Sequence, residues 1–345
     1  MHDRWTSAFR NARWVAVALA ALAMVAAAAP ARAAGDEDYK GWFLTLDAAL
    51  TQPNSLDQHY ANWINWPGSD FTYYDRSERL VMDNDADLSG TIKFGYGFGN
   101  GNGALQVSFW GFDNEDTVED SLPGGVYPSL FGYGYYGGMY LYNSGGVLFK
   151  ARAKTQATTF DVDYLRSYAV GKKTTVTWLA GLRSATFEQT QEFEGVEDTY
   201  YGYIYNQQKH FESDAIGLRL GAAVRFGFTE HFSLAGSTAF SFLQADTEGD
   251  SSQYSEYYDQ YETNHGEDDN IRGEIRDFDL KAVWSYGMMD YFVGYSVSNW
   301  DGLVVDPVPA NEGSYYALGS QASRGRNSIG FNSLHAGVTF KFGGK

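Results

Sequence analysis

AIGLRLGAAVRFGFTEHFSLAGSTAFSFL, residues 215–243, decides the fold class of this chain. Its first twelve residues alternate between apolar side chains and glycine or arginine; the apolar set is Ile216, Leu218, Leu220, Ala222 and Val224. Successive side chains of a β-strand point to opposite faces, so the pattern predicts a strand with one apolar face. GFTE (227–230) then reverses the chain, and 232–243 alternates again. Segments of about ten residues with this two-sided character are typical of membrane-spanning strands.

Eight further segments alternate in the same way. They are GWFLTLDAAL (41–50), LSGTIKFGYGF (88–98), ALQVSFWGF (104–112), TFDVDYLRSYAV (159–170), TVTWLAGLRSATF (175–187), DFDLKAVWSY (277–286), YFVGYSVSNW (291–300) and SLHAGVTFKF (333–342). After Ala33 the chain has no apolar run long enough for a membrane helix. Aromatic residues mark both ends of the segments, as in the two girdles of a membrane barrel; those near the long connections include Trp110, Phe187, Phe211 and Trp300.

The connections between these segments alternate in length. Short ones are NGNG (100–103), GKK (171–173), GFTE (227–230) and GMMD (287–290), and long ones cover about 52–83, 113–155, 190–210, 247–272 and 301–330. This layout predicts an all-β fold, a single antiparallel transmembrane β-barrel of about ten strands (eight to twelve), with short periplasmic turns and long extracellular loops. A soluble β-sandwich is the alternative. An extra hairpin formed by FGYGYYGGMYLY (131–142) and VLFKARA (147–153) would give twelve strands.

The N-terminus has the features of a cleaved export signal. Arg4, Arg10 and Arg13 precede the apolar run 15–29, and Ala31-Arg32-Ala33 places small residues at the cleavage site. We expect a signal peptide at 1–33 and a barrel at 34–345; an uncleaved membrane anchor is the alternative. Cleavage would remove four arginines and one aspartate, leaving 21 basic and 42 acidic residues, a net charge of −21. Such a chain would repel nucleic acid.

Charged residues recur on the strand faces opposite the bulky apolar side chains. A charge facing lipid at mid-depth costs roughly 2–4 kcal/mol, so we expect them inside the barrel. Counting from the short turns predicts one pore-lining layer made of Asp161, Asp163, Arg183, Arg219, Asp277 and Asp279. Other expected lumen residues are Lys93, Arg225, Lys281 and His335, together with Asp47 and Lys341.

Within this layer, Asp161 and Asp163 are expected to pair with Arg183, and Arg183 to neighbour Arg219. Four aspartates against two arginines would make the layer net negative, which favours cations if water passes. Two interpretations stay open: an ion-pair network that fills a narrow barrel, or a solvated lumen that conducts ions.

The acidic, tyrosine-rich stretch 247–272 is a candidate surface site. Carboxylates at this density bind Ca²⁺ or Mg²⁺ through oxygen, and the candidate ligands are Asp259, Glu262, Asp268 and Asp269. No EF-hand spacing is present, so a solvated acidic loop is the simpler interpretation. We expect no dedicated metal and no cofactor.

Enzymatic activity would require a catalytic dyad at the outer rim. Asp83, Asp85 and Asp87 precede one strand, and His210 with Asp214 precedes another, but without the Asp-X-His pattern of ten-stranded outer-membrane proteases. The sequence also lacks Gly-X-Ser-X-Gly, His-Glu-X-X-His and a phosphate-binding loop. We therefore do not expect an enzyme.

Three segments resemble the Legionella-type major outer-membrane proteins, a porin-like family: WLAGLRSATFEQ (178–189), GYSVSNWDGL (294–303) and IGFNSLHAGVTFKF (329–342). The resemblance implies a pore for passive solute passage. Proteins of this kind end on an aromatic residue that the assembly machinery reads, whereas Phe342 here is followed by Gly-Gly-Lys.

Together these patterns predict a protein of the outer membrane. Its expected partners are outer-membrane lipid, periplasmic chaperones and the barrel assembly machinery, and small ions or solutes. The expected function is a small, cation-preferring pore or a structural barrel that controls permeability. The alternatives are a surface-binding or adhesion barrel with functional acidic, tyrosine-rich loops, and an omptin-like protease.

Overall fold

Strand pairing forms all the regular structure described here. The computed structural model describes residues 40–54, 59–65, 76–81, 85–99, 102–128, 141–197, 204–256, 259–304 and 327–342. Among these residues we find no helix that is long and apolar enough to cross a membrane. The predicted signal peptide, residues 1–33, lies outside the described ranges.

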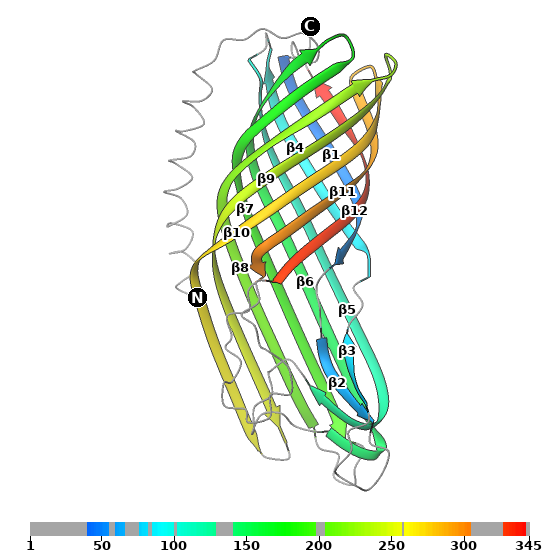
Figure 1. Ribbon diagram of the computed structural model, residues 1–345, viewed down its shortest axis with the longest axis vertical. Coiled ribbons are helices and arrows are strands. Elements are labelled where there is room, and N and C mark those ends of the chain that lie inside the picture. The colour runs from blue at the N-terminus through cyan, green and yellow to red at the C-terminus, as the bar shows by residue number, and fades with distance from the viewer. Residues whose placement is uncertain are drawn as a thin grey trace.

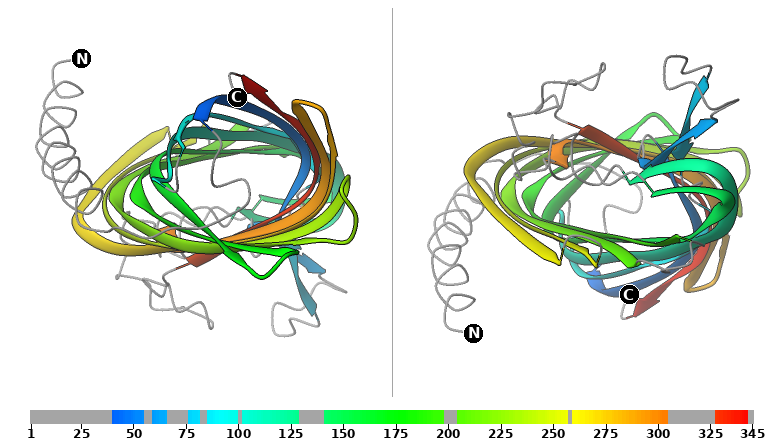
Figure 2. Two further views of the ribbon diagram at one scale, coloured as in Figure 1. Left: turned by 90° about the horizontal axis from the view of Figure 1, so that it is seen from above. Right: turned by 90° about the horizontal axis from the view of Figure 1, so that it is seen from below.

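Twelve strands make up the described part of the chain. Their bounds are β1 (Lys40–Asn54), β2 (His59–Asn65), β3 (Arg76–Val81), β4 (Asp87–Phe98), β5 (Ala104–Pro128), β6 (Leu141–Val170), β7 (Thr174–Glu197), β8 (Ile204–Gly227), β9 (Phe232–Ser255), β10 (Gln260–Tyr286), β11 (Met289–Val304) and β12 (Asn327–Phe342). Ten of them close into a ring in the order β5-β4-β1-β12-β11-β10-β9-β8-β7-β6, with β5 pairing back onto β6 (Figure 2). The hairpin β2–β3 is added outside this ring, where β2 pairs with β5. The predicted single antiparallel barrel is confirmed.

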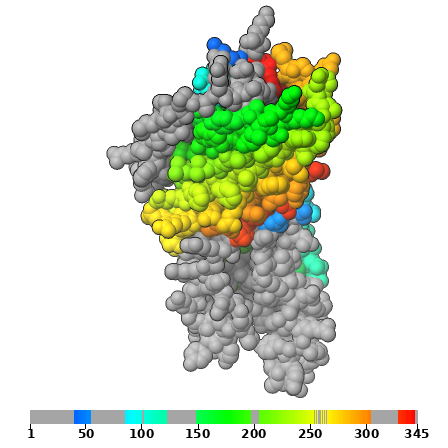
Figure 3. All heavy atoms as spheres, turned by 45° about the horizontal axis from the view of Figure 1, so that its top comes forward, coloured from blue at the N-terminus to red at the C-terminus, as the bar shows by residue number. Residues whose placement is uncertain are grey.

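The two-residue alternation gives the barrel an apolar outer wall. Leu218, Phe240, Leu280 and Trp284 are between 43% and 59% exposed although they are large and apolar. The intervening residues point inward, and many of them are buried and polar or charged. Figure 3 shows part of this wall as a continuous surface from β7, in green, to β10, in yellow to orange. A barrel with this polarity matches lipid outside and seals polar groups inside.

The strands differ greatly in length. Strands β5 to β10 have 24 to 30 residues, whereas β1, β4, β11 and β12 have 12 to 16. A membrane strand needs only about 9–11 residues, so β5–β10 continue as a curved six-stranded sheet beyond the barrel. We call this sheet the extension; it forms the lower half of Figure 1.

The extension corrects three predicted loops. Most of 113–155, 190–210 and 247–272 is strand, because cross-strand pairs continue through them; examples are Arg152↔Glu192 and Glu212↔Glu248. These stretches lack the pattern of a membrane strand because their outward face becomes charged while the alternation continues. Residues 147–153 extend β6 and add no barrel strand, so the twelve-stranded alternative is wrong. Residues 131–140 lie outside the described part.

Candidate functional site in the barrel lumen

Strand register places the predicted charge layer inside the barrel. Asp161 and Asp163 are buried on β6, as is Arg183 on β7, and Arg219 of β8 and Asp277 of β10 turn to the same space. Their lipid-facing neighbours on the same strands, such as Phe160, are exposed. The predicted strand phase is therefore correct for this layer.

Arg183 connects the neighbouring strand β6 to β10 through the lumen. Its Nε and Nη2 donate to the two carboxylate oxygens of Asp161 at 2.6 and 2.8 Å. Its Nη1 donates to Asp277 Oδ2 at 2.7 Å, three strands further along the sheet. Asp277 Oδ1 also accepts from Ser298 Oγ at 2.7 Å. Fork-shaped bonds of this kind are strong and fix the geometry of both partners.

Arg219 is the partner of Asp163, which the sequence prediction assigned to Arg183. In the register Asp163 lies opposite Gly181, and Gly181 lies opposite Arg219. Because Gly181 has no side chain, the Asp163 carboxylate reaches across it and accepts from Arg219 Nη1. Arg219 also lies 3.1 Å from Asp161 and 3.6 Å from Asp277. The two arginines are thus neighbours, as predicted, through shared carboxylates.

Asp279 belongs to a second cluster, one step nearer the short turns. His335 of β12 bridges Asp47 of β1 and Asp279 of β10, with Nδ1–Oδ2 and Nε2–Oδ1 distances of 2.9 and 3.1 Å. Lys281 Nζ lies 3.1 Å from Asp279 and over the ring of Phe292. The single predicted layer is therefore two layers, because inward residues on one strand stand about 6.6 Å apart.

A third cluster lies next to the short turns. Asp290 of β11 accepts from Lys341 Nζ at 3.2 Å and from Arg225 Nη1 at 3.4 Å. Arg225 also donates to Ser233 and Ser285. The sequence interpretation assigned Asp290 to a turn and therefore did not place it in the lumen. Asp290 precedes the buried Phe292 by two residues, so both side chains point to the same face of β11, and this spacing was the available signal.

Charge in the first two clusters is nearly balanced. Five aspartates are present, and Lys93, Arg183, Arg219 and Lys281 oppose them together with His335. Lys93 of β4 has Asp47, Asp279, Arg219 and Lys281 as its electrostatic neighbours. The six residues of the predicted layer have a net negative charge, four aspartates against two arginines, but the neighbouring lysines and His335 offset that charge.

Aromatic side chains fill the lumen on the extension side of these clusters. Phe112, Phe187, Trp300 and Phe331 are each at most 3% exposed, and Trp110 packs against them. Ring centroids of Trp300 and Phe331 lie 5.5 Å apart, and those of Trp110 and Phe331 lie 5.4 Å apart. We call these five residues the aromatic plug. Trp300 Nε1 donates to Ser298 Oγ at 2.9 Å, which joins the plug to Asp277.

The plug corrects part of the predicted outer aromatic girdle. Phe160, Phe242 and Phe278 face outward as expected, whereas Phe187, Phe211 and Trp300 are buried inside. Parity decides the difference: Trp300 shares the inward phase of Ser298, and Phe187 that of Arg183. Aromatic position along a strand was a poorer guide than its face.

The outer wall of the extension carries a histidine between carboxylates. His265 Nδ1 lies 2.8 Å from Asp250 Oδ1, and its Nε2 lies 3.1 Å from Glu267 Oε1. These hydrogen bonds raise the pKa of His265 above its ordinary value. Donor atoms of Glu248, His265 and Glu267 lie within 4.8 Å of one another, in a spacing that fits a metal ion.

The four weak candidate ligands considered in the sequence analysis, which expected no dedicated metal, lie elsewhere on this hairpin. Among the residues that the structure describes, Asp259, Asp268 and Asp269 belong to no group with metal-ligand spacing. The side chain of Glu262 lies outside the described part. Asp268 and Ile271 flank a register shift that separates the acidic residues from each other.

The candidate protease residues do not converge in the described part of the chain. His210 is on the outward face of β8, where Nδ1 lies 3.0 Å from Thr190 Oγ1. Asp214, four residues along the same strand, accepts from Thr186. Asp83 is not described, and the carbonyl of Asp85 accepts from Asn114.

Comparisons with known proteins add little to this description. No family model and no curated protein matches the chain. The outer-membrane protease OmpT from Escherichia coli is similar with a TM-score of 0.46 and 9% identity, covering 88% of this chain and 97% of that one. A Pseudomonas aeruginosa FadL homologue gives 0.25 and 8%, covering 89% and 91%, and the Ralstonia pickettii toluene transporter TbuX gives 0.23 and 7%, covering 88% and 89%.

With scores and identities this low, these likenesses carry no argument about activity, and none favours the Legionella-type family. The assignment rests on the chain's own strand register and burial. By that evidence the chain is a ten-stranded antiparallel transmembrane β-barrel, with ion-pair clusters and an aromatic plug on its inner face and a long one-sided extension.

Proposed function

We propose that the protein is an outer-membrane barrel that serves as a sealed anchor for a surface-binding extension. The observation that carries this proposal is the lumen cross-section, in which Arg183 of β7 bonds Asp161 of β6 and Asp277 of β10, next to the aromatic plug. A narrow barrel filled by packed and paired side chains offers little room for solute. The apolar outer wall supports placement in a membrane.

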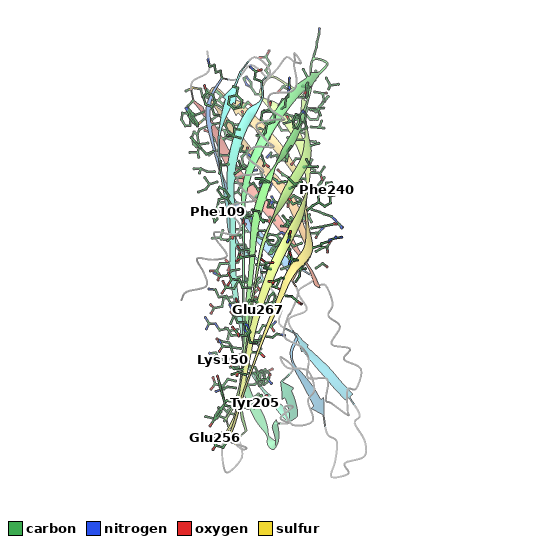
Figure 4. All side chains as sticks on the ribbon, turned by 90° about the vertical axis from the view of Figure 1, so that its left-hand side faces the viewer. Phe109, Lys150, Tyr205, Phe240, Glu256 and Glu267 are labelled. Atoms are coloured by element: carbon green, nitrogen blue, oxygen red, sulfur yellow. The ribbon has the colours of Figure 1, made fainter. Side chains whose placement is uncertain are left out.

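The extension supports a binding role outside the membrane. Its outward face carries cross-strand ion pairs, including Glu119–Lys150 at 2.5 Å and Glu115–Arg152 at 2.8 Å. Figure 4 shows Lys150 and Glu256 on this sheet, far along the strands from Phe109 and Phe240 of the barrel. A paired sheet holds a binding surface more rigidly than a free loop would.

A small, cation-preferring pore is the second candidate. The side chains of Asp277 and Asp279 keep 24% and 21% of their surface exposed, so water reaches part of the charge network. This interpretation requires that water continue past the plug.

Cysteine labelling tests the proposal directly, because the natural chain contains no cysteine. Three variants sample three environments: Thr190→Cys on the outer face of the extension, Ser108→Cys beside Asp161 in the lumen, and Val224→Cys on the apolar wall. A membrane-impermeant thiol reagent added to intact cells should label only Thr190→Cys.

Two results would contradict the proposal. Rapid labelling of Ser108→Cys would mean that the lumen is open to water. Labelling of Thr190→Cys only after cell lysis would mean that the extension does not face the exterior.

A further inference from the structure

The outer wall is hollowed where two glycines meet. Gly90 of β4 lies opposite Gly111 of β5 in the register, and both occupy outward positions in line with Leu88 and Phe109. A groove of about 430 Å³ lies over them and extends across β6 to β7. Its volume is in the range of small-ligand sites.

The groove lies at the boundary between the apolar wall and the extension. Phe109 and Phe160 form an exposed cross-strand pair, and the next outward pair toward the extension is Gly111 with Thr158. One step further, Asp113 lies opposite Gln156. The groove therefore adjoins the lipid-facing surface on one side and the charged extension on the other.

The groove lining combines an apolar edge with neutral and acidic hydrogen-bonding groups. Leu88, Phe112 and Ala157 supply the apolar lining, and the polar lining consists of Ser89, Asp113, Gln156, Thr158, Thr186 and Glu188. Neither lysine nor arginine lines the groove, so its chemistry disfavours a phosphate. Carboxylate, amide and hydroxyl groups together suit a ligand that carries many hydroxyls, each a donor and an acceptor.

We propose that this groove holds the saccharide headgroup of a glycolipid in the surrounding outer leaflet, with an acyl chain along Phe109 and Phe160. The inference rests on the membrane placement in the proposed function. The lipid source follows from continuity: the groove is open toward the apolar wall that lipid covers.

Filling the groove tests the inference with little risk to folding. A Cβ atom on Gly111 would meet only the Phe109 ring, at 3.4 Å, and one on Gly90 only a backbone oxygen, at 3.6 Å. Gly111→Leu and Gly90→Leu should therefore fold and occupy the groove. Gly236→Leu on β9 is the matched control, since its Cβ would meet Leu280 at 3.7 Å on the same outer wall, away from the groove.

The full-length protein is reconstituted in phosphatidylethanolamine vesicles with or without a phosphate-free glycosyl diacylglycerol, and retained glycolipid is counted by native mass spectrometry after mild detergent extraction. Wild type and Gly236→Leu should retain glycolipid. The two groove variants should bind it about tenfold more weakly, because the leucine side chain removes one region of contact with the headgroup. Unchanged retention in Gly111→Leu would overturn the inference, as would equal loss in Gly236→Leu.

Two further arms separate the alternatives. If the free headgroup saccharide of that glycolipid competes fully for the groove, the ligand is a soluble sugar and the lipid assignment is wrong. If the wild-type protein fails to float with vesicles of either composition, the membrane placement itself fails, which is a different result from floating without retained glycolipid.

Discussion

Arg183 joins Asp161 on the adjacent strand to Asp277 across the lumen, and its side chain is 5% exposed. Removing one partner of a buried ion pair leaves uncompensated charge, so Arg183→Ala should lower the free energy of unfolding by about 3–5 kcal/mol. Arg152→Ala is the control. Its pairs with Glu115 and Glu192 lie on the exposed outer face, where an ion pair contributes about 1 kcal/mol or less.

Urea unfolding in detergent or lipid measures both variants. If the two arginine variants lose the same stability, the lumen network is solvated and the filled-lumen description is wrong.

His265 gives a pH-dependent prediction outside the membrane. Its hydrogen bonds to Asp250 and Glu267 stabilise the protonated ring and raise its pKa above the usual 6.5. A raised folded-state pKa contributes stability that is complete below the unfolded pKa and is lost as pH rises through the folded pKa. The β9–β10 hairpin should therefore loosen above pH 6.5, over a range set by the raised pKa.

Nuclear magnetic resonance titration of the imidazole checks this prediction. Asp250→Asn should move the His265 midpoint downward, because it removes the larger of the two hydrogen-bond contributions. A midpoint that is the same in wild type and Asp250→Asn would contradict the contact.

At the scale of a strand pair, Gly181 determines how the residues of the cluster around Arg183 and Arg219 are arranged. A Cβ there would collide with the Asp163 carboxylate and the Val162 carbonyl. Overpacking of this kind costs about 1–3 kcal/mol, and Gly181→Ala should also break the Asp163–Arg219 pair. Gly236→Ala, whose Cβ would meet Leu280 and the Asp279 carbonyl only at ordinary contact distances of 3.7 and 3.8 Å, is the control. The midpoint of thermal unfolding should be lower for Gly181→Ala than for Gly236→Ala. Equal midpoints would show that the Asp163 side chain can adopt another position without loss of stability.

The extension should resist protease although its sequence is polar and rich in cleavage sites. Lys150, Arg152 and Lys154 lie in β6 and are paired on both sides, with β5 and β7. Trypsin needs an extended, unpaired segment, so it should spare these three bonds in intact cells. Mass spectrometry of the digest identifies the cut sites. Rapid cleavage after Arg152 would mean that this stretch is a loop, as its sequence suggested.

The elements that sequence predicted well are those where both faces carry information. In β8 and β10, bulky apolar residues alternate with charge, and each inward charge was placed on its correct face. The extension was missed because its outward residues are themselves charged, so the contrast between faces disappears while strand pairing continues. The ion-pair partner of Asp163 was predicted wrongly because the pair spans three strands: Asp163 reaches across Gly181 to Arg219.

At the scale of the whole molecule, the barrel combines two different halves. The short strands β11, β12, β1 and β4 end at the side of the apolar wall that faces the extension, and β5–β10 carry the sheet well beyond it (Figure 1). Along the lumen, three ion clusters are followed by the aromatic plug. Ring closure and the outer apolar wall could be predicted from the alternating sequence, whereas the ion clusters and the plug could not, because they depend on contacts between distant strands.

The seal across the lumen is the central claim, and planar-bilayer conductance of the purified wild-type protein tests it most directly. We predict no stable conductance steps, under conditions in which an open porin reconstituted in parallel gives them. Stable steps with a cation-selective reversal potential would contradict the seal, and loss of that selectivity in Asp277→Asn/Asp279→Asn would place the conducting path through the charge clusters.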